Sequence, residues 1–314
     1  MKKTSKSKIK YFTPIYDMSS QEYHSTSGVY SSSQLKDLLE DEEIFINKYI
    51  KKTVKREEIS AFDVGTYFHT AILEPDKISD DCAVYDRKIR RGSHWEKFRR
   101  KHDGKAILTR DQRDKALGLV SAVQNSPIAM GLISKGTPEV SLFVKLKVWL
   151  GSIYCYEKKK VLTLDGWIDD NTMPEISDGV DINIKVRADS INFDEGYILD
   201  LKSTTGNSKS ESTIKNKISY YQYDLSAALY LDMFSLYQEV GKFFWTFASK
   251  DVLNTKTWMA SNTNIKVGRA KYIKALLKLA ECIENEWQVV DSLSELEPMS
   301  YELEHLKQKM TDLI

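Results

Sequence analysis

Alternating apolar and polar residues along the chain predict the strands of a β-sheet. In residues 139–150 (EVSLFVKLKVWL) every second side chain is apolar, so these side chains share one face of a strand. Residues 184–204 (IKVRADSINFDEGYILDLKST) predict two apolar-rich strands joined by a tight loop at 193–196, where a glycine supplies the backbone freedom that the loop needs. The segments 242–249 and 255–261 predict a further buried strand and its partner.

Between these strands, apolar residues recur every three or four positions, which is the spacing of amphipathic helices. Ser31, Ser32 and Ser33 precede one such run and mark its start. Thr109 and Gln112 form a capping box at the start of another. Longer helices are predicted at 60–73, at about 213–239 and at roughly 267–288.

Length and composition describe an ordinary soluble globular protein. The 314 residues suffice for one large domain or two small ones, and 41% of them are hydrophobic and 29% charged. The net charge of +1 leaves no overall attraction to nucleic acid, so any such binding must come from a local patch. Three scattered cysteines argue against a disulfide framework and suit a reducing cytosol. No apolar run reaches membrane-spanning length.

The distribution of charges and turn residues predicts one folded domain with two distinct ends. Residues 1–20 predict a flexible basic tail, and residues 21–290 the folded domain. Within it, residues 151–182 are irregular and acidic in their second half, which predicts an inserted hairpin or loop excursion. Residues 291–314 predict a C-terminal helix whose narrow apolar seam could contact its own domain, a second subunit or a partner.

The hairpin at 184–204 carries the most informative charged residues. If it pairs symmetrically about its loop, Asp189 lies directly opposite Asp200, and opposed carboxylates repel unless a cation lies between them. Lys202 shares a strand face with Asp200, while Leu199 and Leu201 point into the core. Two acids and a lysine on one face predict a metal-dependent site that cleaves phosphodiesters. A surface hairpin with solvated charges accounts for the same residues equally well.

A second candidate for DNA contact is the most basic stretch, residues 85–105. It contains Arg90 and Arg91 among nine lysines and arginines, with Trp95 and Phe98 interleaved between them. Sites that follow a DNA backbone combine cations with stacking aromatics. A solvated helix with two core aromatics would have the same sequence pattern, so both interpretations stay open.

The order of the motifs resembles the RecE-type (exonuclease VIII-like) exonucleases. These motifs are YHSTSGVYSSSQL, DVGTYFHTAILEP, an isolated Glu139 ahead of VSLF, RAD, LDLKSTT and YDLSAALY. The family belongs to the PD-(D/E)XK nuclease superfamily, alongside lambda exonuclease and the nuclease domain of RecB. The resemblance spans roughly residues 22–250 and rests on the ordered set, because no single motif is specific. It implies an α/β fold, a restriction-endonuclease-like core with a central mixed β-sheet flanked by helices.

The resemblance also implies a role for individual residues. Asp189 and Asp200 would hold divalent cations, together with His69 from a helix and the Leu201 carbonyl. Lys202 would position the attacking water or help to deprotonate it, and would stabilise charge on the phosphorane.

Four further residues would support this centre. Glu139 would be an outer metal ligand or would hold a water. Arg187 could reach the scissile phosphate or a neighbouring one, and Tyr230 would steady the site. Many relatives carry a helical glutamine where this chain has Ser226, and Gln222 lies one turn earlier.

The activity implied by the resemblance is that of a processive 5′→3′ exonuclease acting on the ends of linear double-stranded DNA. It would use one or two Mg²⁺ or Mn²⁺ ions, and the His69 imidazole favours Mn²⁺. It would leave 3′ single-stranded tails for an annealing protein of the RecT or Red-beta type.

The resemblance further implies a ring-shaped homo-oligomer, no membrane and a bacterial cytoplasm, with a phage or prophage as one source. The alternatives are another PD-(D/E)XK DNA nuclease, either an endonuclease or a structure-selective enzyme, and a catalytically inactive DNA-binding relative.

Overall fold

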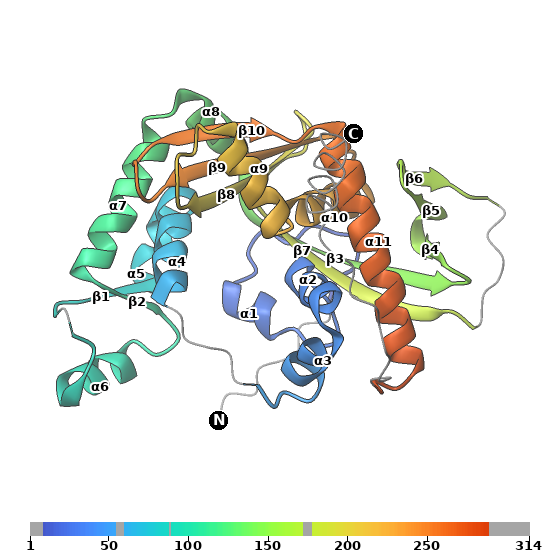
Figure 1. Cartoon of the computed structure of the whole chain (residues 1–314), viewed down its shortest axis with the longest axis horizontal. Helices are drawn as coiled ribbons and strands as arrows, with labels where there is room; N and C mark the ends of the chain where they lie inside the picture. The colour runs from blue at the N-terminus through green and yellow to red at the C-terminus, as the bar shows by residue number, and fades with distance from the viewer. Residues whose placement is uncertain (1–8, 55–59, 88, 172–177, 289–314) are drawn as a thin grey trace, which may run out of the picture.

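An eight-stranded mixed sheet forms the centre of the molecule (Figure 1). The computed structural model describes residues 9–54, 60–87, 89–171 and 178–288. The strands lie in the order β10-β9-β8-β7-β3-β4-β5-β6, with β8 and β9 parallel and the other neighbours antiparallel. The strands are β3 (Thr137–Trp149), β4 (Ser152–Cys155), β5 (Lys160–Thr163), β6 (Gly166–Asp169), β7 (Val180–Asn192), β8 (Tyr197–Thr204), β9 (Lys242–Ser249) and β10 (Thr255–Met259).

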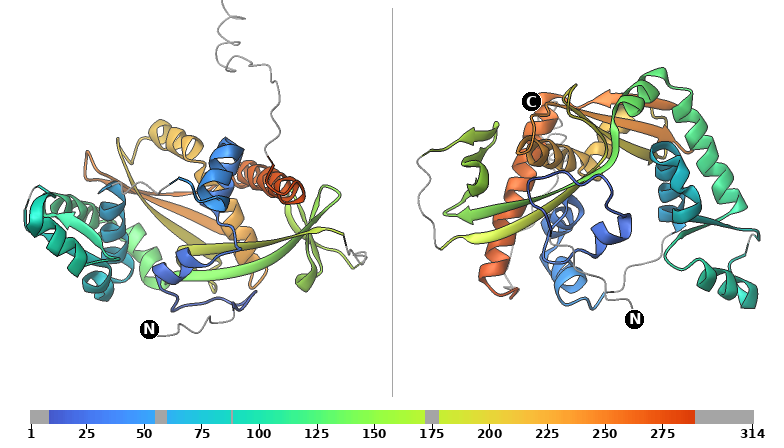
Figure 2. Two further views of the ribbon diagram at one scale, coloured as in Figure 1. Left: turned by 90° about the horizontal axis from the view of Figure 1, so that it is seen from below. Right: turned by 180° about the vertical axis from the view of Figure 1, so that it is seen from behind.

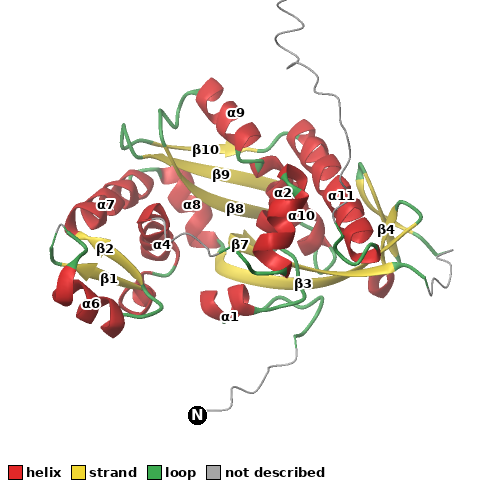
Figure 3. Ribbon diagram, turned by 60° about the horizontal axis from the view of Figure 1, so that its bottom comes forward, coloured by secondary structure: helices red, strands yellow, loops and turns green. Residues whose placement is uncertain are grey.

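Helices cover both faces of this sheet (Figure 3). On one face lie α2 (Ser32–Glu40), α10 (Tyr223–Ser235) and α11 (Asn262–Glu284), and on the other α4 (Ser60–Leu73), α7 (Arg110–Gln124) and α8 (Pro127–Lys135). Strand β8 contributes to both cores, because Ile198 packs on the first face while Leu199 and Leu201 pack on the second. The predicted α/β fold, a central mixed sheet flanked by helices, is confirmed.

The remaining helices are short, apart from α6 and α9. They are α1 (Ser20–Ser25), α3 (Glu42–Phe45), a π-helical turn (Ile46–Ile50), α5 (Ile78–Asp81), α6 (Gly92–Lys101), α9 (Glu211–Tyr220) and two 3₁₀ turns (Pro75–Lys77 and Tyr156–Lys158). Among the described residues, no single helix is long and apolar enough to cross a membrane. Taken together, α7 and α8 have the length and composition, but the chain bends by 89° between them.

A small lobe extends from one end of the molecule, beside α4 and α7 (Figure 2). It contains the parallel strand pair β1 (Cys82–Tyr85) and β2 (Ala106–Thr109), and α6 lies between them in the sequence. The lobe therefore contains the basic stretch 85–105, and it lies at the opposite end of the sheet from β4, β5 and β6 (Figure 1).

The long antiparallel pair β3–β7 holds the core together. Its register runs from Val148–Val180 to Thr137–Ile191, and one face of the pair, which includes Val140, Leu142 and Val144 of β3, is buried in the same core as α10 and α11. This is the face that the alternation in residues 139–150 predicts.

Residues 9–20, which the sequence assigns to the flexible tail, are part of the fold. The Phe12 and Ile15 backbone N–H groups donate to the Phe143 and Ser141 carbonyls of β3, each at 2.8 Å. The edge of β3 in this region is left open by the short strand β4, so the N-terminal segment satisfies backbone groups that would otherwise be unpaired. Residues 1–8 and the predicted C-terminal helix at 291–314 lie outside the described residues.

The long helix predicted at about 213–239 is two helices, α9 and α10, which are separated at Tyr221 and Gln222. Gln222 has a φ of +49°, the left-handed conformation that ends a helix. The sequence offers neither glycine nor proline there. The start of α10 instead lies directly against α11, because a Cβ at Gly268 would be only 2.0 Å from the Asp224 carbonyl oxygen. The first turn of α10 is therefore in close tertiary contact with α11.

Where an inserted hairpin or loop excursion was predicted at 151–182, the described residues 151–171 and 178–182 extend the sheet. They contribute β4, β5, β6 and the start of β7. The turn into β4 uses positive φ at Leu150 (+46°) and Gly151 (+74°), the pattern of a tight two-residue hairpin. The Arg269 guanidinium binds both the Asp232 carboxylate and the Leu164 carbonyl, which fastens this extension to α10 and α11.

Candidate active site

The strands β7 and β8 separate at the predicted acidic pair. Their register pairs Ser190 with Leu199, so the next positions, Asp189 and Asp200, lie opposite each other as the symmetric hairpin predicts. Here the Leu201 backbone N–H donates to the Asp189 carboxylate at 2.7 Å. In a regular sheet this N–H would donate to a backbone carbonyl of β7. Here the Asp189 carboxylate accepts it instead, which holds Asp189 at the β7–β8 fork, the point where the two strands separate.

Glu139 lies opposite Asp189 on the other side of β7. The β3–β7 register places it between the pairs Pro138–Ser190 and Val140–Ala188. Its φ of +52° is unusual for a residue with a side chain inside a strand. Strained backbone of this kind is concentrated at functional sites, where the surrounding structure maintains it.

His69 completes a group of three possible metal ligands. One ligand atom each from His69, Glu139 and Asp189 lies within 4.8 Å of the others. The His69 Nδ1 is 3.5 Å from an Asp189 carboxylate oxygen, and all three side chains remain partly accessible. These residues come from α4, β3 and β7, as the resemblance implies. Two carboxylates and an imidazole form a donor set that fits a divalent cation.

The electrostatic surroundings of Glu139 also fit a bound divalent cation. Burial and the neighbouring Asp189 carboxylate raise the pKa of Glu139 to about 8, although Arg187 partly offsets this. Without a cation, Glu139 therefore keeps its proton at neutral pH. A bound cation would remove this repulsion and stabilise both ionised carboxylates.

Asp200 and Lys202 form a separate ion pair beside this group. Their Oδ1 and Nζ atoms are 2.6 Å apart, and the Asp200 carboxylate is buried. Burial raises the pKa of Asp200 despite the nearby ammonium. Burial would lower the pKa of Lys202, but the Asp200 and Asp189 carboxylates outweigh it and hold that pKa above its ordinary value. These carboxylates therefore favour the ammonium form of Lys202.

The resemblance assigned Leu201 a role as a carbonyl ligand. The contact found for Leu201 here is its N–H bond to Asp189. Because this bond positions the carboxylate, Leu201 contributes to the centre through its backbone, and its carbonyl as a ligand remains a prediction.

Tyr230 and Gln222 lie on the helical side of the site. The Tyr230 hydroxyl is 3.4 Å from the Ser32 hydroxyl of α2, and burial raises its pKa to about 12. Tyr230 thus joins α10 to α2 behind the acidic pair and stays protonated. Gln222 occupies the break between α9 and α10, where its role is conformational.

Arg187 contacts protein groups where a phosphate contact was predicted. Its guanidinium donates to the Ser141 hydroxyl and the Met18 carbonyl, each at 2.8 Å, and lies 3.6 Å from the Glu139 carboxylate. Its position on the strand face was predicted correctly. Two of its partners lie on the neighbouring strand β3, and Met18 lies 169 residues earlier in the chain, which a local pattern cannot show. Arg187 therefore positions Glu139 and the N-terminal segment.

Arg90 also has protein partners. Its guanidinium donates to the Ile107 carbonyl, to Gln112 at 2.6 Å and to Asp63 at 3.3 Å, so it holds the small lobe together. Arg91, by contrast, is exposed at the start of α6.

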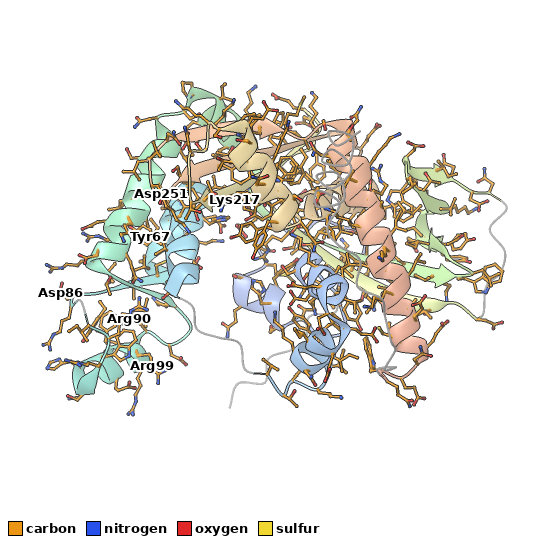
Figure 4. All side chains as sticks on the ribbon, in the orientation of Figure 1. Tyr67, Asp86, Arg90, Arg99, Lys217 and Asp251 are labelled. Atoms are coloured by element: carbon orange, nitrogen blue, oxygen red, sulfur yellow. The ribbon has the colours of Figure 1, made fainter. Side chains whose placement is uncertain are left out.

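The aromatics of the basic stretch are half-buried in the small lobe. Trp95 and Phe98 both pack on Tyr85 with ring centroids 5.1 Å away. Contact of this stretch with DNA therefore stays a prediction, and its aromatic side chains pack within the small lobe. Its outward cations, which include Arg99, remain a charged surface far from α9 (Figure 4).

Sequence patterns did not indicate Lys36 of α2 as part of the site. Its Nζ is 5.4 Å from the centre of the Tyr223 ring, and the Lys202 Nζ is 5.5 Å from the same ring. Burial and the Lys202 charge lower the pKa of Lys36 to about 8. The helical spacing of α2 predicts only its apolar face, so nothing local associates Lys36 with the hairpin.

Comparison with known families agrees with this geometry. The family described as PDDEXK-like domain of unknown function (DUF3799) matches residues 31–165 and 172–295. The chain belongs to this family. The match includes all the acids described above, His69 and Lys202, and it places the protein among PD-(D/E)XK nucleases. No curated protein sequence matches the chain.

One solved structure has a similar fold. The crystal structure of a candidate exonuclease from Eubacterium rectale is similar, with a TM-score of 0.55 and 13% sequence identity. The match covers 90% of this chain and 96% of that one. The structure of SSO0001 matches more loosely, with a TM-score of 0.25 and 13% identity over 70% of this chain and 88% of that one.

Proposed function

We propose that this PDDEXK-like nuclease is a divalent-metal-dependent exonuclease that degrades linear double-stranded DNA from its 5′ ends and leaves 3′ single-stranded tails. The convergence of His69, Glu139 and Asp189 at the β7–β8 fork, beside the Asp200–Lys202 pair, carries this proposal. The order of RecE-type motifs along the chain supports the choice of polarity and substrate.

His69, Glu139 and Asp189 would hold the cation. Both carboxylate oxygens suit Mg²⁺ or Mn²⁺, and the imidazole shifts the preference toward Mn²⁺. Asp200 could contribute to a second ion. When bound, a divalent cation neutralises charge on a phosphate oxygen and makes a water nucleophilic near pH 7.

Lys202 would act through its charge. Because its pKa is held above the ordinary value, it stays protonated and cannot take a proton from water. Of the two roles expected for it, stabilising negative charge on the phosphorane is therefore the one that its surroundings support. Asp200 holds its ammonium group in place at 2.6 Å.

The proposal is tested with linear duplexes labelled at either end. The protein is incubated with 5′- or 3′-labelled linear DNA and with a closed circle, in Mg²⁺, Mn²⁺ or EDTA. We expect the 5′ label to be released first, the circle to stay intact and EDTA to stop the reaction. Nicking of the circle would indicate an endonuclease. Release of the 3′ label first would reverse the polarity, and DNA retention without product would indicate an inactive relative.

From the same resemblance we also infer a ring-shaped homo-oligomer and an annealing partner of the RecT or Red-beta type, in a bacterial cytoplasm. A ring would hold the DNA while successive nucleotides are removed. Light scattering of the purified protein tests this inference, and a monomeric mass at working concentration would contradict it.

A further inference from the structure

Two tyrosines at the break between α9 and α10 are exposed to solvent. Tyr220 is 80% exposed, more than any other large apolar or aromatic side chain in the described residues, and Tyr221 is 46% exposed. Their positions in a helical, aromatic-rich segment suggest core residues. The left-handed Gln222 that follows turns the chain, so that α10 enters the core and these two rings stay outside.

The two exposed rings lead directly to the candidate active site. Tyr220 and Tyr221 pack edge to face with ring centroids 4.9 Å apart, and Tyr221 stacks on Tyr223 at 5.4 Å. The Tyr223 ring in turn lies 5.5 Å from the Lys202 Nζ. A continuous row of three rings thus connects solvent with Lys202.

Lysines accompany this row of rings. Lys217 lies 5.9 Å from the Tyr221 ring centre and donates to the Thr205 hydroxyl, and Lys36 lies beside Tyr223. Within the described part of the chain, neither ammonium is within ion-pair distance of a carboxylate. Aromatic rings interleaved with uncompensated cations are the combination that binds single-stranded nucleic acid, because rings stack on bases while cations contact phosphates.

We propose that Tyr220 and Tyr221 form a stacking platform for the bases of an unpaired DNA strand beside the active site. This inference rests on the proposed nuclease function and names the form in which the DNA end is bound. Bases inside a duplex are already stacked on each other, so an exposed ring gains a partner only where the end has opened. The uncompensated lysines favour a nucleic acid over a protein as the occupant.

The test measures binding without cleavage. Full-length protein in EDTA is titrated into a fluorescent single-stranded oligonucleotide and into a blunt duplex. A second single strand carries 2-aminopurine, whose fluorescence is quenched by stacking. We expect Tyr220→Ala and Tyr221→Ala each to weaken single-strand binding at least about fivefold and to reduce the quenching, since base–aromatic stacking contributes about 1–3 kcal/mol. Binding of the blunt duplex should change by less than about twofold.

Matched variants separate stacking from other causes. Tyr220→Phe and Tyr221→Phe keep the ring and should bind single strands like the wild type. Tyr237→Ala removes a tyrosine of similar exposure (45%) at the other end of α10 and should have no effect. Unchanged single-strand binding by both alanine variants would overturn the proposal and leave a protein partner as the occupant of these rings. Equal losses for the phenylalanine variants, or for the blunt duplex, would also overturn it.

Failure of the stacking proposal can be distinguished from failure of the proposed nuclease function. Single-strand binding in EDTA does not depend on hydrolysis, so the platform can be confirmed or rejected whatever the wild-type protein does to linear DNA. Absence of metal-dependent hydrolysis by the wild type would reject the nuclease function alone.

Discussion

At the scale of single residues, the charge of Lys202 is the one on which the proposed cleavage depends most. Burial disfavours its ammonium form, and two carboxylates more than restore it. A lysine in this state serves as a fixed positive charge at the point where a phosphorane would develop negative charge.

We expect Lys202→Ala to lower the rate of DNA cleavage at least about 100-fold, because a preorganised charge that faces the transition state is lost. Initial rates on linear duplex measure the effect. Lys242→Ala, which removes an exposed lysine from the adjacent strand β9, is the control and should keep full activity. The alanine variant will also be less stable, because Asp200 loses its partner, so rates are compared below its melting temperature. Turnover at the wild-type rate would refute the assignment.

Glu139 gives the protein a specific pH dependence. Its pKa is raised from 4.5 to about 8, so between these values the folded protein binds more protons than the unfolded chain. The contribution of Glu139 to the free energy of unfolding therefore falls as pH rises through this window, by up to about 1.4 kcal/mol per pH unit.

Glu139→Gln should remove this contribution. The free energy of unfolding of the variant and of the wild type is measured by urea unfolding in EDTA at pH 5.5, 6.5 and 7.5. We expect the variant to become more stable relative to the wild type as pH rises. Glu195→Gln, at an exposed carboxylate, should run parallel to the wild type. If the stability of Glu139→Gln changed with pH in parallel with that of the wild type, the raised pKa of Glu139 would be contradicted.

At the scale of elements, the contact between α10 and α11 places Tyr223 beside Lys202. Gly268 allows the two helices to approach, since a Cβ there would meet the Asp224 carbonyl at 2.0 Å. We expect Gly268→Ala to lower the free energy of unfolding by about 1–3 kcal/mol, the cost of overpacking a tight contact. Gly131→Ala in α8, where a Cβ would meet nothing within 4 Å, should be neutral or stabilising by up to about 1 kcal/mol. Urea unfolding compares the two, and equal effects would contradict the close approach.

The same elements show how far the sequence predicts the structure. The β7–β8 hairpin, its register and the buried side of β8 follow from a period of two and a tight loop, which are local properties. The break before α10 does not, because Gln222 adopts the left-handed conformation without the glycine that would predict it. The partners of Arg187 and the position of Lys36 were also missed, since both depend on contacts between segments that are distant in the sequence.

At the scale of the whole molecule, the three-ligand group and the ion pair lie at the point where the sheet opens. Helix α4 brings His69 to that point from one face, and α2 and α10 bring Lys36 and Tyr230 from the other (Figure 3). The family resemblance predicted His69, Glu139, Asp189 and Asp200 as one group. In the fold, one ligand atom each from His69, Glu139 and Asp189 lies within 4.8 Å of the others, and Asp200 lies beside them. The sheet extension β4–β6 and the small lobe lie at opposite ends of the molecule, and the lobe packs on α4, the helix that carries His69 (Figure 1).

The most direct test of the central claim is hydrolysis of linear duplex DNA in Mn²⁺ by the wild type and by Asp189→Asn, with Mn²⁺ binding measured by calorimetry on the same samples. Asp189 lies between His69 and Glu139, and the amide keeps its size while removing its charge. The wild type should bind Mn²⁺ and degrade the DNA, and EDTA should stop it. The variant should lose both properties while remaining folded. Undiminished cleavage by Asp189→Asn, or cleavage that persists in EDTA, would contradict a metal-dependent nuclease centre at the β7–β8 fork.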